Sequence, residues 1–155
     1  MLVLAVVGIL IMMTIPSLRE GAIRKQIREG MTLADLAKQG VAAYYTASGE
    51  MPNNNEQAGI PPAPKIVGNF VTAVSVSDGA VTLTFGNNAN QSIEGKKLTL
   101  RPAIVAEHRA VPIAWVCANV TVPHGMELKG RDATDIPLNW LPVECRSASA
   151  SEKKK

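Results

Sequence analysis

The sequence predicts an α+β fold in which one long N-terminal helix, about residues 1–48, packs on a four-stranded antiparallel β-sheet. Apolar residues recur at helical spacing through the first third of the chain. From residue 69 the spacing changes to two, and the first two alternating runs flank Asp78-Gly79, a strong hairpin signal. A segment bounded by two cysteines follows. With 155 residues, the chain is long enough to bury the core of one domain.

The predicted helix begins with an apolar half, residues 1–16, which read MLVLAVVGILIMMTIP. A signal peptide would need a basic start and a small-residue cleavage site, and neither is present. A buried strand would be shorter. A complete membrane helix needs about 20 apolar residues, more than this stretch offers. We therefore interpret it as the C-terminal part of a membrane helix whose beginning lies upstream.

The amphipathic half, residues 17–48, carries one apolar stripe with charged residues around it. Ser48-Gly49, with Pro52 just beyond, is a typical helix end. A helix of this length would be about 70 Å long, so its first half must project from the body or be buried by other copies. Gly8 and Pro16 disfavour helix, which makes the segment between them the predicted weak point. The stripe consists of Ile23, Ile27, Met31, Ala34, Val41 and either Tyr44 or Tyr45.

A Pro- and Asn-rich loop, residues 49–68, separates the helix from a predicted sheet region, 69–122. The expected strands are 69–77, 80–85, 98–100 and 113–122, and Pro102 is expected to limit the third. Alternation places apolar residues on one face of each of the first two strands, Phe70, Val74 and Val76 in the first and Val81, Leu83 and Phe85 in the second.

Cys117 and Cys145 bound a segment rich in turns, 117–145. An apolar N-terminus that implies export favours a disulfide between them, and two unpaired buried thiols are the alternative. Two cysteines at this spacing, with two distant histidines, do not make a metal site. Residues 146–155, RSASASEKKK, are typical of a flexible tail.

Charge and motifs indicate no enzyme. The net charge of +3 is carried by the three terminal lysines, since the remaining 13 basic residues balance 13 acidic ones. His108 and His124 stand alone, and no P-loop, GxGxxG or GxSxG motif is present. We therefore predict no catalytic residue, no metal and no cofactor. A projecting apolar helix without an active site instead predicts a protein that assembles.

Several stretches resemble the type IV pilin family, of the type IVa class. VVGILIMMTIPS (6–17) resembles its hydrophobic helix, with Gly8 and Pro16 at the family's glycine and proline positions. YYTASGEMP (44–52) is similar to the end of that helix. LPVECR (141–146) is similar to the closing cysteine motif, and the runs at 68–85, 96–100 and 115–117 are similar to successive strands. The resemblance covers almost the whole chain.

The resemblance implies a major subunit of a type IV pilus, a helical filament used for adhesion, twitching motility and DNA uptake. It implies a subunit held in the inner membrane before assembly and in an extracellular filament afterwards, with copies of itself and the pilus assembly machinery as partners. The Cys117–Cys145 loop would be the exposed region that differs between strains. The implied assembly surface of the helix consists of Leu2, Leu4, Val7, Gly8, Ile9, Leu10, Ile15 and Pro16.

The family's basic leader, methylated phenylalanine and assembly glutamate are not found in this sequence. We expect the native protein to have an upstream leader ending in glycine, followed by five or six more residues that include a glutamate.

Two other functions stay open at this point. A minor pilin that acts as a DNA receptor would need basic residues on its body, for which Arg101, Arg109, Lys129, Arg131 and Arg146 are candidates. The alternative is that these basic residues lie on a solvated surface, where nearby acidic residues balance their charge. A pseudopilin of a type II secretion system is less consistent with the cysteine pair.

Overall fold

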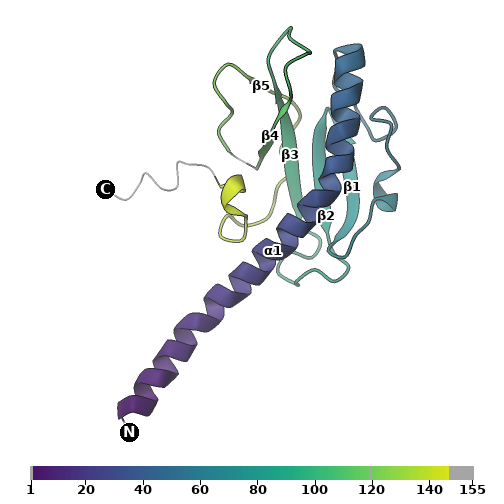
Figure 1. The fold of residues 1–155 in the computed structure, drawn as a ribbon. Helices are drawn as coiled ribbons and strands as arrows, with labels where there is room; N and C mark the ends of the chain where they lie inside the picture. The colour runs from purple at the N-terminus through teal and green to yellow at the C-terminus, as the bar shows by residue number, and fades with distance from the viewer. Residues whose placement is uncertain (1, 119, 147–155) are drawn as a thin grey trace.

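The computed structural model describes residues 2–118 and 120–146, and it contains one long helix laid across a twisted antiparallel sheet (Figure 1). Helix α1 spans Leu2–Ser48, and its N-terminal half projects away from the body. The predicted combination of a long helix with a four-stranded antiparallel sheet is confirmed. Of the predicted tail, only Arg146 lies within the described residues.

The sheet runs in the order β1-β2-β3-β4, with a two-residue strand, β5, paired to β3. The sequence analysis did not predict β5. Two short 3-10 helices, η1 and η2, lie in the loop after α1 and near the second cysteine. The bounds are β1 Val71–Ser77, β2 Ala80–Phe85, β3 Lys97–Ile104, β4 Ala114–Cys117, β5 Glu127–Leu128, η1 Ala63–Lys65 and η2 Val143–Cys145.

The C-terminal half of α1 forms one wall of the core. Ile23, Ile27, Ala34 and Val41 of the predicted stripe are buried, and Met31 packs against the same cluster from a partly exposed position. A Cβ added at Gly30 would lie 2.7 Å from Cε1 of Phe85 and 2.9 Å from Cγ2 of Val71. The helix therefore approaches β1 and β2 more closely at this turn than a larger residue would allow.

The β1–β2 hairpin forms at the predicted Asp78-Gly79 turn. Both turn residues have positive φ, 49° and 79°, as a type I′ turn requires. The alternation does not continue unbroken back to Phe70, because β1 begins at Val71 and a bulge interrupts the register between Val71 and Ala73. Val71, Val74 and Val76 are buried, and Phe70 packs against the same core from a partly buried position.

The third strand is longer than predicted. β3 continues through Pro102 to Ile104, pairing first with β2 and then with β4 and β5. Proline lacks an N–H but keeps its carbonyl, and the carbonyl of Pro102 accepts a hydrogen bond from the N–H of Lys129 (2.9 Å). The strand therefore tolerates proline at a position where an acceptor is used.

The fourth strand is shorter than predicted. β4 covers Ala114–Cys117 rather than 113–122. Ala118 has a φ of 51°, which takes the chain out of the extended conformation directly after Cys117. Asn119 lies outside the described residues, and Val120–Val122 form no strand.

Candidate assembly surface

The projecting half of α1 exposes a large apolar surface. Val3 and Leu4 are both 74% exposed, and the other large apolar residues of this half up to Ile11 are about half exposed. Soluble monomers rarely expose contiguous apolar patches of this kind, so such a patch indicates a surface that another molecule covers. The exposed residues are Val3, Leu4, Val6, Val7, Ile9, Leu10 and Ile11.

The predicted assembly residues all lie on this helix. Leu4, Val7, Ile9 and Leu10 are exposed, and a Cβ added at Gly8 would meet nothing within 4 Å. Leu2, Ile15 and Pro16 lie in the same continuous helix, which passes through Pro16 without a break. Their packing against other copies stays a prediction. Within residues 2–118 and 120–146, no helix carries an apolar stretch long enough to cross a membrane.

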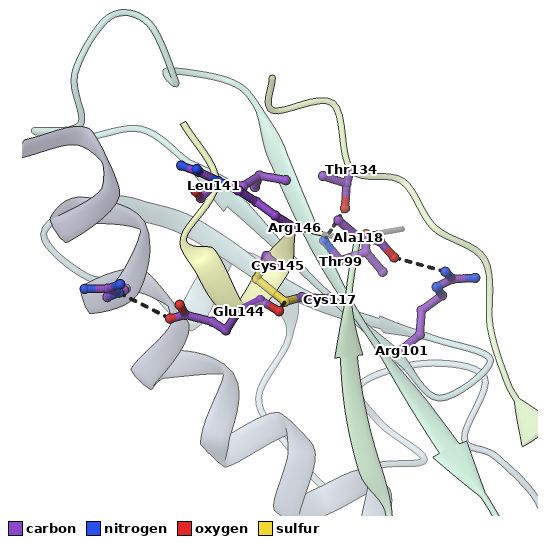
Figure 2. The surroundings of a disulfide bond; sticks show 10 residues. Thr99, Arg101, Cys117, Ala118, Thr134, Leu141, Glu144, Cys145 and Arg146 are labelled. Carbon is purple, nitrogen blue, oxygen red and sulfur yellow. Dashed lines mark hydrogen bonds and ion pairs between the residues drawn. A yellow bond between two sulfur atoms is a disulfide. The ribbon is translucent and has the colours of Figure 1, made fainter. Parts of the chain in front are cut away.

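Cys117 and Cys145 form the predicted disulfide, with an S–S distance of 2.04 Å (Figure 2). Both cysteines are buried, and neither is free, which excludes the alternative of unpaired thiols. The bond joins the end of β4 to the short helix η2. It therefore ties the last described part of the chain to the edge of the sheet.

Two arginines one turn apart on α1 hold the same C-terminal segment from the other side. Arg24 donates from Nη2 and Nε to the carbonyl of Asn139, at 2.8 and 3.2 Å. Arg28 forms an ion pair with Glu144, Nε to Oε1, at 3.2 Å. Arg146 donates to the carbonyls of Leu141 and Asn139 from within the segment. The segment is thus fixed to both the helix and the sheet.

A further anchor joins residues 132–135 to the edge of β3 beyond the end of β4. The N–H of Thr99 donates to Oγ1 of Thr134 at 3.0 Å, and the N–H of Asp135 donates to the carbonyl of Lys97 at 3.1 Å. Thr99 Oγ1 accepts from the N–H of Ala133. An irregular segment therefore takes the place of a neighbouring strand beside β3. No periodicity in the sequence predicts this pairing.

Four of the five candidate DNA-contacting residues have contacts within the chain. Arg101 donates to the carbonyl of Ala118 at 3.1 Å, and Lys129 pairs with Glu127 at 2.8 Å. The Arg109 guanidinium lies against the backbone of Gly49, and Arg146 is bound as described above. Arg131 is exposed. The Lys129–Glu127 pair offsets one positive charge, and the hydrogen bonds of Arg101 and Arg146 occupy N–H groups that phosphate oxygens would otherwise use.

The described residues offer no site for metal chemistry. They contain no group of three or more His, Cys, Asp or Glu side chains arranged to hold a metal ion. His108 is exposed, with Nδ1 3.0 Å from the carbonyl of Ala106, and His124 lies in an exposed turn. The features that stand out in this molecule are therefore its exposed helix and its anchored C-terminal segment.

Comparison with known proteins gives a consistent assignment. Residues 24–146 match the sequence model of the pilin family, described as a bacterial filament protein. The chain is 34% identical to a fimbrial protein of Neisseria meningitidis serogroup A, with 97% of this chain and 92% of the relative covered. It is 32% identical to the type IV major pilin protein PilE1 of Neisseria gonorrhoeae (97% and 85% covered). It is 33% identical to the fimbrial protein EcpC of Eikenella corrodens (96% and 87% covered).

The fold agrees with these matches. It combines a long helix that has an exposed apolar half, an antiparallel sheet packed on the other half and a disulfide-bounded C-terminal segment. The chain therefore belongs to the pilin family.

Proposed function

We propose that this chain is a major structural subunit of a type IV pilus. The proposal rests on the difference in burial between the two halves of α1. The C-terminal half packs in the core, whereas the N-terminal half is apolar and exposed. The relatives named as type IV major pilins support the major rather than a minor role.

The exposed half of α1 gives a strong reason to assemble. Seven large apolar side chains between Val3 and Ile11 are about half or more exposed. Burying a side chain of this type contributes about 1.5–3 kcal/mol when it is complete, so covering all seven would contribute on the order of 10 kcal/mol per subunit. Copies that bundle these halves together would obtain this stabilisation without any other partner.

The same surface suits two apolar surroundings in turn. Before assembly it would be held in the inner membrane, and afterwards in the core of an extracellular filament, since both exclude water. Contacts between unlike surfaces of successive copies would generate an open helical filament. The pilus assembly machinery would transfer subunits from one environment to the other. Adhesion, twitching motility and DNA uptake are the roles we propose for the filament.

A charge placed in the exposed half tests this proposal. We suggest expressing the native protein and its Leu4→Asp variant in a bacterium with type IV pilus machinery but without its own pilin. Val67→Asp is a matched control, because Val67 is 54% exposed but lies in the loop after α1. Electron microscopy of shed filaments and mass spectrometry of their main band would be the measurements.

We expect filaments made of this chain from the native protein and from Val67→Asp, and none from Leu4→Asp. The Leu4→Asp chain should still contain the Cys117–Cys145 bond, because the N-terminal half of α1 projects away from the body. Normal filaments from Leu4→Asp would contradict the proposal.

A further inference from the structure

β1 is an edge strand, and one side chain of the loop after α1 binds backbone groups in the middle of its free side. The sheet order leaves β1 with β2 as its strand partner on one side and the loop after α1 on the other. From that loop, Nδ2 of Asn55 donates to the carbonyl of Val74 at 2.9 Å, and Oδ1 accepts from the N–H of Val76 at 2.7 Å. Nδ2 also donates to the carbonyl of Pro61 at 2.8 Å. Asn55 is only 8% exposed.

The two backbone groups that Asn55 binds are the ones that a neighbouring parallel strand would use. The carbonyl of Val74 and the N–H of Val76 flank Ser75 on the same edge. A residue of a parallel neighbouring strand would use these same two groups, donating to one and accepting from the other. The Asn55 amide therefore occupies the place of one residue of a missing strand.

The edge next to Asn55 has room for another chain. A hollow of about 620 Å³ lies there, lined by residues of the loop and of β1 that include Ile60, Pro62, Ser75 and Val76. An edge strand with unsatisfied backbone groups and space beside it is a template for pairing with a second molecule. In the proposed filament, the bodies of many identical subunits would lie close together, which would favour such pairing.

We propose that Asn55 is an edge cap that prevents β1 from pairing with the β1 edge of a second copy. The side chain must donate and accept at once, which an amide does and a carboxylate or an alanine does not. The choice of a second copy as the partner rests on the proposed function, whereas peptide binding tests the cap on the folded body without filament formation.

Binding of a β1 peptide tests the cap. We suggest comparing the full chain with its Asn55→Ala and Asn55→Asp variants in detergent solution. The probe is a fluorescently labelled synthetic peptide with the sequence of residues 71–77, VTAVSVS. Asn53→Ala is the matched control, because Asn53 is an exposed asparagine of the same loop and does not line the hollow. Fluorescence anisotropy reports peptide binding, and hydrogen exchange reports the Val76 amide.

We expect Asn55→Ala to bind the peptide at least about tenfold more tightly than the native chain, with exchange of the Val76 amide faster by a similar factor. Asn55→Asp should change in the same direction, because its carboxylate cannot donate to Val74. Asn53→Ala should behave as the native chain does. Folded variants that bind no more peptide than the native chain would overturn the proposal. Failure of both variants to fold would also overturn it, because Asn55 would then be required for the fold itself.

Discussion

Nε of Arg28 and Oε1 of Glu144 lie 3.2 Å apart, although 116 positions separate the two residues in the chain. One turn earlier, Arg24 makes two hydrogen bonds to the carbonyl of Asn139. Both contacts join α1 to the disulfide-bounded segment, but they differ in exposure. The Arg24 side chain is 29% exposed and that of Arg28 is 56% exposed.

This difference predicts unequal effects of removing the two arginines. Arg24→Ala should lower the free energy of unfolding by about 1–2 kcal/mol, because a partly buried charged donor with two hydrogen bonds is lost. Arg28→Ala should cost less than about 1 kcal/mol, as is usual for an exposed ion pair. Urea denaturation of the full chain in detergent measures both. A larger loss for Arg28→Ala would contradict this ranking.

Removing the disulfide should have a larger effect. The bond closes a loop with a sequence separation of 28 residues. On the chain-entropy model, the double variant Cys117→Ala/Cys145→Ala should be destabilised by roughly 3–4 kcal/mol. Denaturation of the oxidised native chain and of the double variant tests this. Equal stability of the two would show that the helix and sheet anchors hold the segment without the bond.

Two glycines of α1 should respond in opposite ways to alanine. At Gly30 a Cβ would lie within 3 Å of Phe85 and Val71, so Gly30→Ala should destabilise the protein by about 1–3 kcal/mol through overpacking. At Gly21 a Cβ would meet nothing within 4 Å, so Gly21→Ala should stabilise the helix by about 0.5–1 kcal/mol. Thermal unfolding of the two variants in parallel gives the comparison. A stabilised Gly30→Ala chain would refute the close approach at this turn.

The segment of α1 between Gly8 and Pro16 should open more readily than the rest of the helix. Proline offers no N–H to the turn before it, and glycine favours the unfolded chain. Hydrogen exchange of the full chain in detergent should therefore be faster at residues 9–15 than at residues 27–45, which pack on the sheet. Pro16→Ala should reduce the difference. Uniform protection along α1 would contradict the expectation.

The folded body should not bind DNA at physiological salt. Arg101, Lys129 and Arg146 are engaged within the chain, and the charge outside the three terminal lysines is balanced. We expect no gel shift of duplex DNA by the full chain at about 150 mM salt. A variant without the terminal lysines is the control. A gel shift that persists in this variant would contradict the expectation and support a DNA-receptor function.

The main elements were predictable because local signals agreed with one another. The apolar spacing of Ile23, Ile27 and Val41 fixed the buried face of α1, and Asp78-Gly79 fixed the hairpin. The continuation of β3 through Pro102 was not predictable, because it depends on which backbone group the neighbouring strand uses. The end of β4 at Cys117 likewise depends on the next residue, Ala118, which has a backbone conformation that alanine rarely adopts.

The contacts that position the C-terminal segment were not predictable for a different reason. Arg24 and Arg28 look like ordinary charges on the outer face of an amphipathic helix, and their partners lie more than 110 positions away. Asn55 stands in a run of three asparagines that reads as a solvated turn, yet it is buried against β1. Such roles depend on tertiary placement, which one sequence does not reveal.

The anchoring of residues 132–135 on β3 has a practical consequence for protein engineering. The stretch between β4 and this anchor is held at its start by Cys117 and at its end by Thr134 and Asp135, and its turn at His124-Gly125 is exposed. A guest peptide inserted at this turn would be fixed at both ends without changing the register of the sheet. If the subunits polymerise, each would then display one copy of the guest peptide, which makes the turn a grafting site for surface display.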